Sequence, residues 1–364
     1  MHGESLLHWA FSKGHVDLAK LLIDHGAETE AQDERGRTPL HRALSGDHVD
    51  LVGLLIERGA DATAKDKYGC TPLHLASEGG RVDLAHLLIE HGANAAAQDE
   101  EGWTPLHWAS EGGHVDLARL FIKHGTGTAA QDKHGWTPLH MVSLWGHVDL
   151  ARLLIDHSAD AAAQDEHGWT PLHWASERGH VDLAQLLIEH GADPAAQDEH
   201  GRTPLHWASE RGHVDLARLF IEHGTDATAQ DDRGWTPLHW ASERGHVDLA
   251  RLFIKHGTDM AVQDEDGSTP LHRVSLWGHV DLARLLIEHG ADAAAQDQHG
   301  CTPLHFVSSQ GHVDLAQLLI ENGADVAVQD KDGSSPLYLA SEGGHVALAQ
   351  LLIEHGATTA VYIP

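Results

Sequence analysis

A motif of 33 residues, written eleven times without interruption, sets the strongest limit on the fold of this chain. The tetrapeptide Thr-Pro-Leu-His recurs at a fixed spacing, and a degenerate copy stands near each end. The copies begin at Thr38, Thr71, Thr104, Thr137, Thr170, Thr203, Thr236, Thr269 and Thr302, and the degenerate ones at Ser5 and Ser335. A period of roughly 20 to 50 residues is typical of arrays in which each unit packs on its neighbours. Positions are counted below from this Thr or Ser as 0, so that a repeat runs from −5 to +27.

The residues inside each repeat predict two helices joined by a turn. Thr at 0 and Pro at +1 suit a helix N-cap and the first helical position. Gly at +9, such as Gly113 or Gly179, favours the left-handed residue that ends a first short helix. The apolar run from +11 to +18 predicts a second helix, which Gly at +21, such as Gly191, ends. Because one such pair cannot bury its own core, the repeats must stack into an all-α solenoid.

These residues closely resemble the ankyrin repeat. One repeat shows the pattern at Asp165, Gly168, Thr170, Pro171, Leu172, His173, Ala175, Gly179, His180, Leu186, Leu187, Gly191, Ala192 and Asp193. The resemblance covers essentially residues 1–364 and implies a single array, with repeats that start near residues 1, 33, 66, 99, 132, 165, 198, 231, 264, 297 and 330. It implies antiparallel helix pairs with projecting β-hairpin fingers. It also implies protein recognition by the fingers and by the concave surface of the first helices, without catalytic residues.

Some positions depart from the family's pattern. Where the family often has Asn in the loop after Gly-Ala-Asp, this chain has Ala162, Ala195 or Thr228, so hydroxylation of that Asn is not implied. Asp47 replaces the Gly at +9 in one repeat, and Ser158 replaces the Gly at +21 in another. Each replacement is expected to cost about 1 kcal/mol if the left-handed backbone is kept.

Net charge restricts the partners that the chain can bind. With 24 Lys and Arg against 55 Asp and Glu, the charge is −31, which argues against nucleic acid or an anionic membrane surface as a partner.

The sequence has no apolar run long enough to span a bilayer and no signal region at its start. Cys70 and Cys301 both occupy position −1, seven repeats apart, and cannot pair or share a metal in a rigid array. We therefore expect a cytoplasmic monomer.

Histidine is abundant, at 35 residues, but 29 of these lie at the framework positions +3, +10 and +20. The resemblance implies that the +3 His bonds to the Thr hydroxyl and to neighbouring backbone. The spacing does not suit a metal site, so no metal is expected. Protonation of all 35 histidines would bring the net charge to +4, which predicts a large change in solubility between roughly pH 7 and pH 5. The alternative is that this response is a by-product of repeating a His-rich unit.

No enzyme motif stands out in the sequence. It has no nucleophile elbow, phosphate-binding loop, HExxH motif or pair of catalytic carboxylates. We therefore expect no catalysis and no cofactor.

The eleven tryptophans all lie outside the framework, at positions +4, −1 and +8. Positions +4 and +8 share one face of the first helix, and −1 lies on the finger. Trp, Arg and Met are enriched at the centres of protein interfaces. The pattern predicts partner binding by Trp103, Trp108, Trp136, Met141, Trp169, Trp174, Arg178, Trp207, Arg211, Trp235, Trp240, Arg244 and Arg273. The alternative is that the +4 side chains pack against neighbouring repeats.

The sequence thus predicts a non-catalytic module that binds a protein or an extended peptide on its concave and finger surface. The mixture of aromatic and cationic residues in the middle of the array suits an extended or acidic segment. Three alternatives stay open: a sensor or adaptor portion of a larger receptor or enzyme, an elastic scaffold, and an engineered array without a native partner. Neither end resembles a polar capping repeat, which suggests that the array was cut from a longer protein.

Overall fold

The computed structural model describes residues 5–46 and 48–358, which form 22 helices and contain no β-strand. Each repeat supplies two helices, as its sequence predicts. The first helices are α1 (Leu6–Ser12), α3 (Pro39–Ser45), α5 (Pro72–Glu78), α7 (Pro105–Glu111), α9 (Pro138–Trp145), α11 (Pro171–Arg178), α13 (Pro204–Arg211), α15 (Pro237–Arg244), α17 (Pro270–Trp277), α19 (Pro303–Gln310) and α21 (Pro336–Glu342). The second helices are α2 (Val16–Asp24), α4 (Val49–Glu57), α6 (Val82–Glu90), α8 (Val115–Lys123), α10 (Val148–Asp156), α12 (Val181–Glu189), α14 (Val214–Glu222), α16 (Val247–Lys255), α18 (Val280–Glu288), α20 (Val313–Glu321) and α22 (Val346–Glu354).

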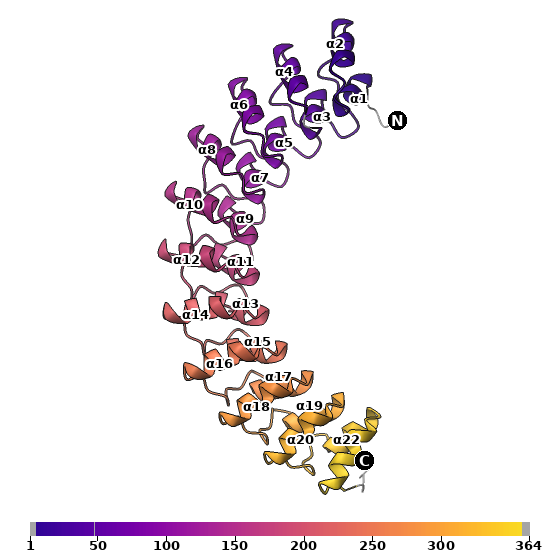
Figure 1. Cartoon of the computed structure of the whole chain (residues 1–364), viewed down its shortest axis with the longest axis vertical. Coiled ribbons are helices and arrows are strands. Elements are labelled where there is room, and N and C mark those ends of the chain that lie inside the picture. The colour runs from indigo at the N-terminus through magenta and orange to yellow at the C-terminus, as the bar shows by residue number, and fades with distance from the viewer. Residues whose placement is uncertain (1–4, 47, 359–364) are drawn as a thin grey trace. The chain divides into compact units, whose positions relative to one another are not determined.

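The chain divides into two compact units, Met1–Ala175 with Gln185–Ala192, and Ser176–Ala184 with Asp193–Pro364. Within each unit the first helices of successive repeats pack side by side, and the second helices form a neighbouring row (Figure 1). This is the all-α solenoid of helix-turn-helix units that the repeat predicts.

The core of each repeat lies between its two helices and those of the adjacent repeats. In one repeat of the second unit, Leu238 and Ala241 of α15 are fully buried, as are Leu249, Ala250 and Phe253 of α16. The apolar residues at +13, +14, +16 and +17 of this repeat therefore face inward, because burial of this surface supplies the main driving force for stacking.

The histidine at +3, which is replaced by Tyr338 in α21, helps to begin the first helices. In α15 the Thr236 N–H donates to Nδ1 of His239 at 3.2 Å, and the His239 N–H donates back to the Thr236 hydroxyl at 3.4 Å. The two residues thus satisfy two backbone donors reciprocally, as a capping box does with Glu or Gln in place of His. The interaction with the Thr that the resemblance implied is confirmed.

The fingers are hydrogen-bonded turns rather than the two-stranded hairpins implied by the resemblance. In one finger the Asp66 N–H donates to the Cys70 carbonyl at 2.9 Å, as in an antiparallel pair. The Cys70 N–H, however, donates to Oδ1 of the Asp66 side chain at 3.0 Å. A regular pair exchanges both backbone hydrogen bonds. Because the carboxylate takes the second one, no strand ladder forms.

Ser158 stands in the left-handed region, with φ of 69°, where the equivalent residue of the next repeat is Gly191. The backbone geometry of the repeat is therefore kept at a residue with a Cβ atom. We predict that Ser158→Gly stabilises the protein by about 1 kcal/mol, measured as the free energy of unfolding in urea. The other replaced glycine position, Asp47, lies outside the described residues.

The matched control for Ser158→Gly is the reverse change at Gly191, whose φ is 94°. A Cβ atom added there meets no other atom within 4 Å, so backbone conformation alone should set the cost. Gly191→Ser is expected to destabilise by about the same 1 kcal/mol. Equal stability of Ser158→Gly and the wild type would show that the left-handed serine carries no strain.

Candidate functional site

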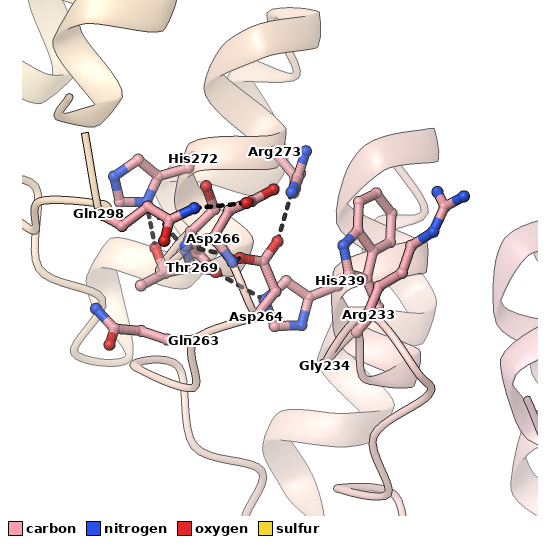
Figure 2. A network of polar contacts seen from close by, with 12 residues as sticks. Arg233, Gly234, His239, Gln263, Asp264, Asp266, Thr269, His272, Arg273 and Gln298 are labelled. Atoms are coloured by element: carbon pink, nitrogen blue, oxygen red, sulfur yellow. Dashed lines mark hydrogen bonds and ion pairs between the residues drawn. The ribbon is translucent and has the colours of Figure 1, made fainter. Parts of the chain in front are cut away.

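A buried or half-buried aspartate at position −5 organises the base of the fingers. Oδ1 of Asp264 accepts hydrogen bonds from the backbone N–H groups of Asp266 at 3.0 Å and Ser268 at 2.8 Å. Its Oδ2 faces the first helix and accepts from the Arg273 guanidinium (Figure 2). The carboxylate therefore ties the finger to the side chain at +4 of the same repeat.

The same contact recurs with tryptophan at +4. The Trp207 indole N–H donates to Oδ2 of Asp198 at 3.2 Å, and that of Trp240 donates to Oδ2 of Asp231 at 3.2 Å. At +4, Trp207, Trp240 and Arg273 thus each offer an N–H group to the carboxylate at −5 of the same repeat. Position +4 contributes to the fold as well as to the surface.

The electrostatics of this contact are clearest in the second repeat. Burial works to raise the pKa of Asp33, but the backbone N–H of Arg37, the Arg42 guanidinium and the backbone N–H of Arg35 hold this pKa below its usual value. The Arg42 guanidinium lies 2.6 Å from Oδ2 of Asp33. The finger carboxylate is therefore stabilised as an anion by the donors around it.

The tryptophans at −1 and +4 stack on one another. In the first unit the Trp174 ring lies with its centroid 4.3 Å from that of Trp169 and 4.6 Å from that of Trp136. In the second unit the Trp235 and Trp240 centroids are 4.6 Å apart. The rings therefore stack within a repeat, and the contact between Trp136 and Trp174 joins two neighbouring repeats of the first unit.

Guanidinium groups extend these stacks in the second unit. The Arg202 guanidinium lies 3.8 Å from the centroid of the Trp207 ring, and that of Arg273 lies 4.3 Å from the centroid of Trp235. At these distances a cation is attracted to the ring quadrupole. The side chains of this surface are thus held in place before any partner arrives.

The arginines at +8 form ion pairs with glutamates at +7. The Arg211 guanidinium lies 2.8 Å from Oε1 of Glu177, and that of Arg244 lies 3.0 Å from Oε1 of Glu210. Arg178 contacts the other oxygen of Glu177 at 2.9 Å. Positive charge on this surface is therefore largely balanced within the chain, and it offers an acidic peptide less than the sequence pattern suggested.

The predicted binding residues differ in accessibility. Met141, Trp207 and Trp235 are buried, with exposed fractions of 3%, 8% and 7%. Seven are half-buried: Trp103, Trp108, Trp136, Trp169, Trp174, Trp240 and Arg273. The three arginines at +8, Arg178, Arg211 and Arg244, are exposed.

Two tryptophans that the prediction left out are the most accessible. Trp145 and Trp277 at +8 are 53% and 55% exposed. Their position, shared with the exposed arginines, is the sequence signal that could have found them.

Eight of the +3 histidines are buried between neighbouring repeats, where burial favours the neutral ring. His239 accepts the Thr236 N–H at Nδ1, so its proton lies on Nε2, which donates to the Ser268 carbonyl of the next repeat at 3.1 Å. Burial lowers the pKa of His239 to about 4. Burial likewise lowers the pKa of seven others, namely His41, His74, His107, His140, His206, His272 and His305. The expected change to +4 was therefore too large for the folded protein.

The described residues offer few groups suited to nucleophilic catalysis or to metal binding. Burial raises the pKa of the Cys70 thiol to about 12 and that of Cys301 to about 11, which makes both poor nucleophiles. Within residues 5–46 and 48–358, no three His, Cys, Asp or Glu side chains gather as a metal site would require. None of the described helices is both long and apolar enough to cross a bilayer.

Comparison with known families matches nearly the whole chain to one of them. The family described as ankyrin repeats (3 copies) matches residues 2–66, 58–132, 91–165, 125–198, 158–231, 205–297, 248–330 and 290–362. A comparison with curated proteins found no match.

Proposed function

The chain belongs to the ankyrin repeat family, whose repeats generally act as protein–protein interaction modules, and from this premise we propose that it binds a partner protein or extended peptide without catalysis. The partner would lie along the first helices and fingers, across the tryptophans and arginines at −1, +4 and +8. The family is typically non-catalytic. The proposal extends to a single array that works as a cytoplasmic monomer, since a charge of −31 disfavours self-association.

One observation carries this proposal. The side chains at −1, +4 and +8 vary between repeats, yet several of the tryptophans and arginines among them are held by a carboxylate or a neighbouring ring, as Trp240 is by Asp231 and Trp235. A surface whose side chains are already ordered loses less conformational entropy on binding. Half-buried tryptophans beside exposed arginines also match the composition of interface hot spots.

The test removes the three exposed arginines at +8 together, as Arg178→Ala, Arg211→Ala and Arg244→Ala. A partner captured from a lysate of the source organism by the wild type would be identified, purified and titrated calorimetrically. We expect the triple variant to bind it at least about tenfold more weakly. Because Glu177 and Glu210 lose their ion pairs, the variant should lose about 1–3 kcal/mol of stability but stay folded by near-UV circular dichroism.

The matched control removes three exposed arginines from second helices, as Arg119→Ala, Arg218→Ala and Arg251→Ala. This control changes the net charge equally and should leave the dissociation constant unchanged. If both triple variants bind the partner with equally reduced affinity, overall charge and not the first-helix surface governs binding. Full binding by the +8 triple would overturn the proposed surface.

A further inference from the structure

Two recurring contacts, one to the backbone carbonyl and one to the carboxylate, hold glutamates at +7 in the second unit. The His213 Nε2–H donates to the Glu177 carbonyl oxygen at 3.3 Å, while Arg211 pairs with the Glu177 carboxylate at 2.8 Å. Both donors come from the repeat that follows Glu177. They fix the backbone and the side chain of one residue at the same time.

The same two contacts hold Glu210 in the next repeat. His246 Nε2 lies 3.0 Å from the Glu210 carbonyl oxygen, and Arg244 lies 3.0 Å from the Glu210 carboxylate. The side chains of Glu177 and Glu210 are only 13% and 12% exposed. A mostly buried carboxylate needs such a partner, because burial without one is costly.

Glu243 is the third glutamate of the series, and only the contact to its backbone is present. The His279 Nε2–H donates to its carbonyl oxygen at 3.1 Å. The residue that follows in the place of Arg211 and Arg244 is Trp277, which carries no positive charge to form an ion pair with the carboxylate. Among the residues that the structure describes, none donates a hydrogen bond to the Glu243 carboxylate or forms an ion pair with it.

The charges around Glu243 do not replace the missing arginine. Arg244 pairs with Glu210 and Arg273 pairs with Asp264, while Arg233 and Glu210 act on Glu243 only through space. Burial raises the pKa of Glu243, even though Arg273, Arg244 and Arg233 work to lower it. The negative charge of the half-buried Glu243 carboxylate is therefore only partly balanced by the neighbouring arginines.

Beside the Glu243 carboxylate, Trp277 offers an aromatic ring on which a cation could stack. Its ring is 55% exposed, and by repeat register it stands to Glu243 as Arg211 stands to Glu177. Arg202 over Trp207 shows how a guanidinium stacks on an indole in this unit, at 3.8 Å from the ring centroid. An indole face beside a carboxylate suits a planar cation, which can stack and donate hydrogen bonds together.

We propose that Glu243 and Trp277 receive the guanidinium of an arginine from the partner protein. That arginine completes from outside the ion pair that Arg211 and Arg244 make within the chain. This inference rests on the proposed function and adds the chemistry of the partner, which presents a basic side chain at α15 and α17. An acidic partner segment would meet an unpaired carboxylate here.

The chain contains an internal comparison for this site. Glu111 and Trp145 have the same positions four repeats earlier, and His147 Nε2 lies 3.1 Å from the Glu111 carbonyl oxygen. Glu111 is exposed, however, so water already solvates its carboxylate. Guanidinium binding is therefore expected at Glu243 in preference to Glu111.

The experiment titrates the purified protein with N-acetyl-arginine-amide and follows the indole N–H resonance of Trp277, assigned with Trp277→Phe. N-acetyl-citrulline-amide, which has nearly the same shape without the charge, is the matched probe. The arginine probe should shift the resonance saturably, and the citrulline probe should bind about tenfold more weakly. Glu243→Gln should weaken the arginine probe to a similar degree, whereas Glu111→Gln should not.

A second variant tests the site without any ligand. Trp277→Arg supplies the missing guanidinium within the chain, and it should lower the pKa of Glu243 and remove the site for the arginine probe. Because Trp277 is exposed, this variant should fold like the wild type, as checked by near-UV circular dichroism. Equal shifts with both probes, an unaltered affinity of Glu243→Gln, or an unchanged Glu243 pKa in Trp277→Arg would each overturn the inference.

These outcomes are separable from those of the proposed function. The probe titration needs no partner protein, so failure to capture a partner would count against the proposed function alone. A captured partner that binds Glu243→Gln and wild type equally, but loses affinity for the +8 triple variant, would count against this inference alone.

Discussion

Acidification from about pH 7 to about pH 5 is expected to destabilise each unit of the protein steeply. Four histidines at position +3 with lowered pKa values lie in each unit: His41, His74, His107 and His140 in the first, and His206, His239, His272 and His305 in the second. In the unfolded chain each would titrate near its ordinary pKa of 6.5. The unfolded state therefore takes up protons that the folded state does not.

The sign of the effect follows from the direction of these pKa shifts. A group with a lowered folded pKa contributes its full stabilisation above the unfolded value of about 6.5. That contribution is lost as the pH falls from there toward the folded value, which is about 4 for His239. Each histidine adds at most about 1.4 kcal/mol per pH unit to the slope, so four give at most about 5.5 kcal/mol per pH unit for one unit.

Urea unfolding at several pH values, followed by circular dichroism, measures this slope. Less negative net charge at pH 5 reduces self-repulsion and acts in the opposite direction, so a loss of stability reports on the buried histidines. High salt should leave the slope in place, because desolvation rather than long-range charge causes the shifts. A free energy of unfolding that stays constant from pH 7 to pH 5 would contradict this account.

Asp264→Ala is expected to cost about 3–5 kcal/mol of the free energy of unfolding. The change removes the acceptor of the Asp266 and Ser268 N–H groups and leaves the Arg273 guanidinium without its carboxylate. These groups lie beneath a finger, where Asp264 itself is buried, so water replaces the lost contacts poorly. Urea unfolding of the purified variant measures the loss.

Asp266→Ala is the matched control, because it removes the same charge two residues away on the exposed side of the finger. Its effect should stay within about 0.5 kcal/mol, as for most surface substitutions. Asp264→Asn should fall between the two, since an amide oxygen can still accept the backbone hydrogen bonds. If Asp264→Ala costs no more than Asp266→Ala, the carboxylate does not organise the finger.

The sequence predicted most of the fold because the signals that begin and end its helices are local. Thr or Ser at 0, Pro at +1 and Gly at +21 act within one helical turn of the residues that they affect, and the period of 33 fixes which element comes next. Even the left-handed backbone at Ser158 could be anticipated from the position that it shares with Gly191. The finger was missed because Asp66 uses its side chain where a hairpin would use its backbone.

The candidate site was only partly predictable, because spacing along the chain does not say which side chains meet. The spacing predicted that +4 and +8 share one face of the first helix, but the contact of +4 with the aspartate at −5, as between Trp240 and Asp231, follows from how the finger folds back. The exposed Trp277 was overlooked in favour of the buried Trp207, since residue type alone does not report accessibility.

By itself the sequence determined the number of repeats, the two helices of each and the family to which they belong, because short-range capping and periodic apolar residues suffice for these. The tertiary structure decided which groups are charged and which are satisfied. His239 is held neutral by burial while its Nε2–H donates to a carbonyl 29 residues away, and Arg244 reaches a carboxylate 34 residues back, while Glu243 finds no such partner. These facts depend on burial and on distances between repeats, which exist only once the repeats have stacked.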